Sequence, residues 1–441
     1  MVYSLSKTTP FLKSLRLMLL IVIACVAFDS LEPVQAQSLK EQQTRGLKML
    51  DTIKQDVKEY YFDPTFHGLD LDAHFKKAGE QIKQAVDGNQ ILGIIGYTLL
   101  AFEDRHTLFI PPVLGVRVDY GWEMKMVGNK CYVVSVKNDS DAGAKGLHAG
   151  DRILSVFDIE PTRDNLWQIK YLFYSLRPLN AMNVVVQSPG GKPRQLELLT
   201  KVRKTTLDSL EDMARAGGFS YQYYYNDVVN DIFIWKMPNF LINEKGVDVM
   251  MKMVGQHKAL ILDLRGNGGG YLTSLQRLLG YFFDYDVVIG EERSRKNSTK
   301  VIAKSAGSRV FTGRVVVLVD SDSASAAEVF ARTLQRTSRG IVVGDITSGT
   351  LRGAKHFKHV FEIGYIVTLT YEASVTFSEL IMPDGKSLER IGVTPDKLLL
   401  PDDTALANGE DPVLIDAAEI VGVRFDPRKA GPPAKFKTEN R

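Results

Sequence analysis

The stretch that decides the fold is residues 315–328, which read VVVLVDSDSASAAE. Its five consecutive apolar residues, Val315–Val319, predict a strand that is buried on both faces, as in a parallel sheet. The apolar spacing that follows, through Phe330 and Leu334, predicts a helix. Hydrolases place a nucleophilic serine at such a turn, because the helix N-terminus is electropositive and small neighbours admit a substrate carbonyl. Serine and alanine also form ordinary helix caps, so this stretch alone leaves a purely structural interpretation open.

A second apolar run ends in a glycine-rich turn, and residues 259–270 read ALILDLRGNGGG. The run predicts a central strand, and the glycines predict a tight turn into a helix over residues 271–279. Consecutive glycines leave backbone N–H groups accessible to a ligand, so the turn could form an oxyanion hole or an anion-binding nest. The spacing of a phosphate-binding loop is absent, and a simple packing turn is the other alternative.

These two motifs, in this order, resemble the C-terminal-processing and tail-specific protease family of serine peptidases and their tricorn-core relatives. The resemblance continues through the segments GIVVGD, MPDG and ERIGVTPD, at residues 340–345, 382–385 and 389–396. It implies an α/β fold in which a crotonase-like ββα superhelix forms the catalytic domain. A PDZ domain and an N-terminal helical region would precede this catalytic domain.

The resemblance also implies the catalytic roles. Ser325 would be the nucleophile, and the amide of Ala326 would hold the oxyanion together with an amide of the Gly269–Gly270 turn. Losing one such donor typically costs about 2.7–4 kcal/mol of transition-state stabilisation.

The general base is the point at which the sequence departs from the best-known members of the family. They use a Ser–Lys dyad, but the position of that lysine holds Thr350 here. Lys355 lies farther along, on a predicted strand, and a lysine needs burial to lower its pKa before it can act as a base. A displaced dyad with Lys355 is therefore the weaker alternative.

The tricorn-like members use serine, histidine and glutamate, and this chain has candidates for both partners. His106 lies in the segment FEDRHTL (residues 102–108), and Glu389 opens the segment ERIGVTPD. A histidine is already close to its pKa at neutral pH, which favours His106 as the base. The structural alternatives are that His106 only packs the helical region onto the catalytic domain and that Glu389 is a surface carboxylate.

Residues 120–202 resemble a PDZ domain, most clearly in the segment SDAGAKGLHAGDRIL (residues 140–154). On this resemblance Tyr120, Gly121 and Trp122 would form the loop whose amides receive a peptide carboxylate beside an open sheet edge. The alternative is a spacer or lid that has lost peptide binding.

The first residues are typical of a secretory signal. Three basic residues precede an apolar run over residues 17–28, and a polar region follows it up to Ala36. We therefore expect an exported protein, periplasmic or extracellular, cleaved after Ala36. In the alternative, residues 22–25 form a bacterial lipobox, and Cys25 is lipidated and anchors the protein to the membrane.

The expected domain order follows from these assignments. It is a signal peptide (1–36), a helical region (37–110), a PDZ domain (111–202), a peptidase domain (203–425) and a flexible tail (426–441). Apolar residues at helical spacing over residues 39–110 support the helical region, and a hairpin is predicted over residues 360–371.

Composition excludes some classes of function. The net charge of +3 argues against nucleic-acid binding, and 44% hydrophobic residues suit a globular core. No metal or cofactor is expected, because a His-Glu-x-x-His helix and a cysteine cluster are both missing from the sequence.

The predicted function is an exported serine endopeptidase that cleaves unfolded or C-terminal segments of proteins through an acyl-enzyme. Its partner would be a protein or peptide substrate, bound by its C-terminus at the PDZ domain. The alternative is a PDZ-bearing peptide-binding protein on a catalytically degenerate scaffold, which the missing lysine motivates. A crotonase-type acyl-CoA enzyme is disfavoured by the PDZ module and the signal peptide.

Overall fold

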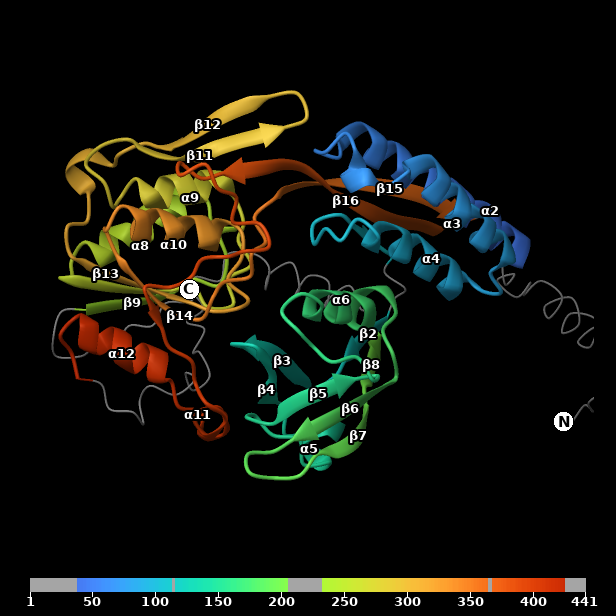
Figure 1. Cartoon of the computed structure of the whole chain (residues 1–441), viewed down its shortest axis with the longest axis horizontal. Coiled ribbons are helices and arrows are strands. Elements are labelled where there is room, and N and C mark those ends of the chain that lie inside the picture. Colours follow the sequence, from blue (N-terminus) through green and yellow to red (C-terminus); the bar gives the residue numbers. More distant parts are fainter. Residues whose placement is uncertain (1–37, 113–115, 205–231, 364–366, 425–441) are drawn as a thin grey trace, which may run out of the picture.

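The computed structural model describes residues 38–112, 116–204, 232–363 and 367–424, in three parts (Figure 1). We call them the helical region (residues 39–110), the β-domain (residues 116–204) and the α/β domain (residues 232–424). The predicted signal peptide (1–36), including Cys25, and the predicted tail (426–441) lie outside the described residues. Within the described ranges, no helix is both long and apolar enough to cross a membrane.

The helical region consists of three helices: α2 (Leu39–Tyr60), α3 (Leu71–Gln84) and α4 (Gly88–Leu100). Each starts at a side-chain cap, because Ser38, Asp70 and Asp87 accept hydrogen bonds from the first-turn amides. The short 3₁₀ helix η1 (Phe66–Gly68) separates the first two helices. The predicted helical periodicity is confirmed.

A long hairpin within residues 353–381, far along the chain, completes the helical region. Its strands are β15 (Gly353–Ile363) and β16 (Val367–Ile381), and β1 (Leu108–Ile110) pairs antiparallel with β16. Tyr371, Ala373 and Val375 of β16 belong to the same apolar core as α2, α3 and α4. The helical region therefore does not form its core from residues 37–110 alone, since its apolar helix faces need this strand to bury them (Figure 1).

The β-domain contains a five-stranded antiparallel sheet in the order β3-β4-β5-β6-β7, with β3 at one edge. These strands are Trp122–Val127, Lys130–Val136, Arg152–Val156, Ala181–Gln187 and Arg194–Leu199. A two-stranded ribbon joins β2 (Val116–Asp119) to β8 (Lys201–Lys204). The helices are α5 (Asp141–Ala144), α6 (Leu166–Lys170) and the π-helix η2 (Tyr171–Leu176).

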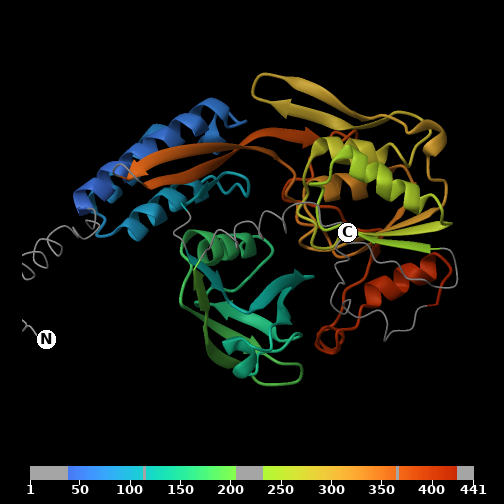
Figure 2. The same cartoon turned by 180° about the vertical axis from the view of Figure 1, so that it is seen from behind.

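The α/β domain is built on a fully parallel sheet in the order β17-β14-β13-β10-β9. The strands are Lys397–Leu398, Ile341–Gly344, Arg314–Val319, Ala259–Asp263 and Ile232–Lys236. One face packs against α8 (Glu244–Val254), α9 (Leu272–Leu279) and α10 (Ala326–Arg336), and the other against α12 (Pro412–Ile420). Seen from behind, the red α12 lies on the opposite side of the sheet from α8 and α9 (Figure 2). The sheet is covered on both faces, which explains the unbroken apolar runs of β10 and β13.

The remaining strands connect the helical region with the α/β domain. Strands β11 (Val287–Ser294) and β12 (Ser298–Ala303) pair with each other, and β11 also pairs with the end of β16. The short elements η3 (Gly307–Arg309) and α11 (Asp403–Asn408) lie in connections. The strand β16 therefore extends from the helical region into the α/β domain (Figure 1).

Candidate active site

Ser325 lies at the turn between β13 and α10, in a backbone conformation that serine rarely adopts. Its φ is 55° and its ψ is −119°, and it is the N-cap of α10. Its N–H donates to the Thr350 carbonyl at 2.9 Å, which holds the turn from outside the helix. Strained φ/ψ angles cluster at functional sites, and a strained strand-to-helix turn is how hydrolases expose a nucleophilic serine.

The glycine-rich turn after β10 lies directly against this serine. A Cβ added to Gly269 would lie 2.6 Å from Ser325 Cβ and 3.0 Å from Ser325 Oγ. Gly269 also has a φ of 94°, which disfavours any residue with a side chain. The two motifs that are over fifty residues apart in sequence are thus brought together at one point.

The amides around Ser325 are partly committed to internal hydrogen bonds. The Gly269 N–H donates to Asn267 Oδ1 at 2.9 Å, and the Asn267 carbonyl accepts from Ala324 N at 2.8 Å. Within the described part of the chain, the amides of Gly270 and Ala326 have no acceptor. Of the predicted oxyanion donors, these two are therefore the ones open to a ligand.

Glu328, in the first turn of α10, is a site residue that sequence reasoning missed. Its buried carboxylate accepts four hydrogen bonds of 2.6–2.9 Å, from the amides of Ser325, Gly349 and Thr350 and from the hydroxyl of Thr347. Glu328 therefore holds the turn of residues 320–325, which we call the Ser325 turn, against the loop of residues 347–350. The spacing Ser325-x-x-Glu328 is that of a capping box, which was the signal available in the sequence.

His106 lies in the loop between α4 and β1. Its backbone N–H donates to Asp104 Oδ1, and its carbonyl accepts from Ser374 Oγ. Among the residues that the structure describes, its buried Nε2 has no hydrogen-bond partner, and no hydrogen bond joins it to Ser325. Burial lowers the pKa of His106 below its ordinary value, so the neutral imidazole is favoured.

Glu389 is tied to the backbone that follows Thr350. Its Oε2 accepts from the amides of Leu351 at 2.8 Å and Arg352 at 3.2 Å. No hydrogen bond to Ser325 or His106 is present among these described residues. Glu389 therefore shapes the loop beside Ser325 in this structure.

Thr350 and Lys355 occupy different surroundings. The Thr350 carbonyl accepts from the Ser325 amide, and its hydroxyl lies within hydrogen-bond distance of Ser348 and Arg105. Lys355 is on β15, with its Nζ 5.3 Å from the Tyr60 ring centre and 5.0 Å from the Phe377 ring centre. The two aromatic rings hold the lysine by cation–π contacts, which is a structural role.

The three residues predicted to bind a peptide in the β-domain are all buried. The Tyr120 hydroxyl donates to the Phe173 carbonyl, and Trp122 belongs to the domain core. The Gly121 amide already donates to Asp119 Oδ1 at 3.0 Å. The Gly121 amide is therefore occupied in this structure, and the role of this loop in binding a carboxylate through its amides stays a prediction.

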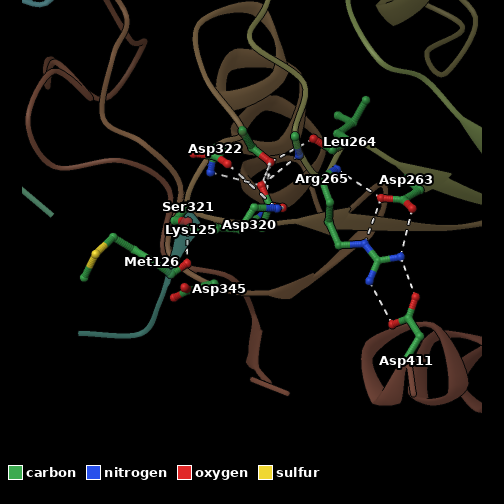
Figure 3. Close-up of polar contacts among 12 residues, drawn as sticks. Lys125, Met126, Asp263, Leu264, Arg265, Asp320, Ser321, Asp322, Asp345 and Asp411 are labelled. Carbon is green, nitrogen blue, oxygen red and sulfur yellow. Dashed lines mark hydrogen bonds and ion pairs between the residues drawn. The ribbon is translucent and has the colours of Figure 1, made fainter. Parts of the chain in front are cut away.

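The β-domain contacts the Ser325 turn through its edge strand β3 (Figure 3). Lys125 Nζ lies 2.5 Å from Asp320 Oδ2, and the Ser321 hydroxyl donates to the Met126 carbonyl at 2.6 Å. Asp320 Oδ1 accepts from the Gly266 amide at 2.8 Å, so the ion pair also reaches the glycine-rich turn. Sequence alone did not indicate this junction.

Arg265 anchors the start of the glycine-rich turn (Figure 3). Its guanidinium forms bidentate hydrogen bonds of 2.7–2.9 Å with Asp263 and with Asp411, which caps α12. Burial would raise the pKa of Asp263, but Arg265 and Lys236 outweigh burial and hold it below its ordinary value. Paired charges in bidentate geometry make this turn rigid.

Comparison with known proteins supports the assignment of the α/β domain. Residues 232–399 match Peptidase family S41. The chain is 27% identical over 262 residues to the tail-specific protease of Haemophilus influenzae, covering 57% of this chain and 36% of that protein. It is 34% identical over 148 residues to the carboxy-terminal processing protease CtpA of Bacillus subtilis, covering 33% and 29%.

Other similarities extend over more of the chain. A probable CtpA-like serine protease of Staphylococcus haemolyticus is 24% identical over 349 residues, which cover 78% of this chain and 64% of that protein. The structure of mature CPAF complexed with lactacystin superposes with a TM-score of 0.61 and 13% identity, covering 83% and 96%. At that identity the likeness shows a shared fold alone. The chain spans about a third to two thirds of the lengths of the first two relatives.

Proposed function

The chain belongs to the C-terminal-processing protease family, and we propose that it is a serine endopeptidase with Ser325 as its nucleophile. One observation carries the proposal. The strained Ser325 turn lies against Gly269, beside two backbone amides, of Gly270 and Ala326, that have no acceptor within the described residues. This is the arrangement that acyl transfer requires.

The proposed reaction follows from these positions. Ser325 Oγ attacks the carbonyl carbon of a peptide bond, and the carbonyl oxygen becomes an oxyanion that accepts from the Ala326 and Gly270 amides. The amine leaves with a proton, and water then hydrolyses the acyl-enzyme. Each oxyanion donor is worth about 2.7–4 kcal/mol.

We propose His106 as the general base and Glu389 as the residue that polarises the site. His106 is kept neutral by burial, and its Nε2 is unpartnered within the described residues, so it can still accept a proton. Hydrogen bonds of catalytic groups often form only when substrate is bound, so the missing contact with Ser325 is compatible with this role. The aromatic contacts of Lys355 support neither proton transfer nor a displaced dyad.

The β-domain is proposed as a PDZ module, the α/β domain as a crotonase-like superhelix, and the protein as exported. Its substrates are proposed to be unfolded or C-terminal segments of proteins. The five-stranded antiparallel sheet with β3 as an edge strand supports the PDZ assignment, since peptides bind PDZ domains by adding to a sheet edge.

The experiment that tests this function is cleavage of an unfolded protein. Wild type should release fragments, Ser325→Ala should release none, and Ser308→Ala, at an exposed serine of η3, should act like wild type. Cleavage by Ser325→Ala at the wild-type rate would contradict the proposal.

A second candidate is a peptide-binding protein on a degenerate protease scaffold. It is favoured by Thr350 at the lysine position and by the lack of a hydrogen bond between Ser325 and His106. It predicts peptide binding without Ser325-dependent cleavage, so the same assay separates the two.

A further inference from the structure

A pocket lies where the end of α2, the β11–β12 hairpin and the β15–β16 hairpin meet. Its volume is about 370 Å³. It therefore lies between the helical region and the α/β domain, and none of the three proposed catalytic residues lines it. The charged residues of its lining are Glu59, Glu292, Arg295, Lys296 and Lys355.

Arg295 extends from the tip of the β11–β12 hairpin to the helical region (Figure 1). Its Nη1 donates to the Lys58 carbonyl, in the last turn of α2, at 2.8 Å. Its guanidinium carbon lies 5.6 Å from the centre of the Phe66 ring. Its Nε and Nη2 are buried and meet no acceptor among the residues that the structure describes. Burying charged donors without an acceptor is costly, so this side of the guanidinium favours binding an acceptor from outside the chain.

Two other arginines show what the same side of a guanidinium binds in this protein. Arg277 Nε and Nη2 donate to the two carboxylate oxygens of Asp248, at 2.7 and 2.8 Å. Arg265 binds Asp263 in the same way, at 2.9 Å from both nitrogens. The two N–H groups on this side are parallel and match two oxygens of a carboxylate or a phosphate. Within the described ranges, Arg295 is the only arginine in which both groups are buried and unpartnered, which points to an oxyanion as its ligand.

Lys355 brings a second cation to the pocket at a fixed position. Its Nζ lies 5.3 Å from the Tyr60 ring centre and 5.0 Å from the Phe377 ring centre, and both aromatic residues also line the pocket. The rings orient the ammonium group but carry no net charge to neutralise it. Lys355 is exposed and forms no ion pair within the described part of the chain, and the same holds for Lys296. Both lysines can therefore donate to a bound anion.

The two carboxylates of the lining do not neutralise these cations. Glu292 accepts a hydrogen bond from the Ser378 hydroxyl at 2.8 Å, and Glu59 is exposed. Neither carboxylate forms an ion pair with a cation of the lining, as far as the described residues extend. Three cations against two carboxylates leave the pocket positive, which favours an anion.

The pocket has room for a small molecule. Pockets for such ligands measure about 300–1,000 Å³, and this one lies at the lower end of that range. Ser294, Asn297 and Thr299 also line it and can form hydrogen bonds with polar groups of a ligand. Its size and polarity suit a compact molecule that carries an oxyanionic group.

We propose that this pocket binds the phosphate or carboxylate group of a small molecule, held by Arg295 Nε and Nη2 and by Lys355 Nζ. The guanidinium of Arg295 is held by one hydrogen bond, so a rotation of the side chain can present its two buried N–H groups to the ligand. The bound oxyanion would join the tip of the β11–β12 hairpin to β15 beside the end of α2. It would thereby brace the helical region against the α/β domain, and this role does not depend on the proposed peptidase function.

Thermal unfolding of the full chain tests the proposal. The probe is inorganic phosphate near neutral pH, titrated at constant ionic strength with sodium chloride as the balancing salt. The melting temperature of the wild type should rise and then saturate, because a ligand that binds only the folded state stabilises it. A parallel titration with acetate separates the two classes of ligand, since the anion that saturates at the lower concentration carries the preferred group.

Variants locate the site. Arg295→Gln should weaken binding of the preferred anion roughly tenfold, because two charge-assisted hydrogen bonds are lost. Lys355→Gln should also weaken it. Arg293→Gln is the matched control, since this arginine lies two positions away, is 56% exposed and pairs with Glu291, so binding should not change. Circular dichroism verifies that each variant is folded.

Three results would overturn the proposal. The first is a rise in melting temperature that does not saturate and is equal in wild type and Arg295→Gln, since this reflects general stabilisation by salt. The second is the absence of a rise with either anion. The third is an equal loss in Arg293→Gln, which would indicate a response to surface charge alone. If Arg295→Gln does not fold, Lys355→Gln decides, because unchanged binding in that variant overturns the site and weaker binding supports it.

Discussion

Ser325 keeps its unusual backbone angles because its neighbours supply the hydrogen bonds that compensate for them. Its amide donates to both Glu328 Oε2 and the Thr350 carbonyl, and Glu328 in turn binds Gly349 and Thr350. Serine at the start of a helix could be predicted from the small-residue pattern. The four hydrogen bonds to Glu328 could not be predicted in this way. Three of their donors belong to the loop of residues 347–350, about twenty positions farther along the chain.

At the same scale, His106 is the residue whose role is easiest to test. His106→Ala should lower kcat by about 10²–10⁴-fold with the fold intact, because general-base assistance is lost. Lys355→Ala, which removes a cation from between two aromatic rings, should leave kcat close to wild type. Peptide-cleavage kinetics with circular dichroism for folding measure both, and the opposite pattern would assign the base to Lys355.

The pH dependence of cleavage should follow the lowered pKa of His106. Because burial disfavours the imidazolium, the base stays neutral as pH falls below the ordinary value of about 6.5. Activity is then lost only as pH falls through the lowered pKa. The acidic limb of kcat/KM should therefore have its midpoint below about pH 6.5. A midpoint above that value would argue against a buried neutral histidine as base.

At the scale of elements, sequence patterns predicted most of the strands, turns and helices around the site. The strand–turn–helix units around Gly269 and Ser325 were expected, and the hairpin over residues 360–371 was expected but is longer, spanning β15 and β16. What the patterns could not show is how closely the turns approach. The distance between the turns depends on the parallel register of β10 and β13, which pairs Asp263 with Leu318. This register places both turns at the carboxyl ends of neighbouring strands.

The glycine-rich turn offers a matched pair of substitutions. Gly269→Ala should abolish cleavage, because its Cβ would lie 2.6 Å from Ser325 Cβ and its φ is 94°. Gly268→Ala should be tolerated, since an added Cβ there meets nothing within 4 Å. Cleavage assays and thermal unfolding would compare them, and an active Gly269→Ala protein would contradict the close approach.

At the scale of the whole molecule, the three parts meet around the Ser325 turn. Arg105 of the helical region bonds Ser348 and Thr350, and Lys125 of the β-domain pairs with Asp320. The sequence indicated the order of the parts but not this junction, because each contact joins residues more than 190 positions apart. The sequence also did not show that β16 contributes to two hydrophobic cores, because the residues it contacts there are distant in sequence.

The Lys125–Asp320 pair should make a measurable contribution to stability. Lys125→Met leaves the largely buried Asp320 carboxylate without its cation, which should lower the free energy of unfolding by about 3 kcal/mol. Lys137→Met breaks an ion pair whose lysine is 60% exposed and should cost less than about 1 kcal/mol. Urea denaturation compares the two variants, and equal losses would show that the junction is not a special source of stability.

The most direct test of the central claim is labelling by a fluorophosphonate probe, which reacts with activated serines. Mass spectrometry of the labelled wild-type protein should locate the probe on Ser325, and Ser325→Ala should remain unlabelled under the same conditions. A wild-type protein that is folded and binds peptide but is not labelled, or equal labelling of Ser325→Ala, would contradict the assignment of Ser325 as the nucleophile.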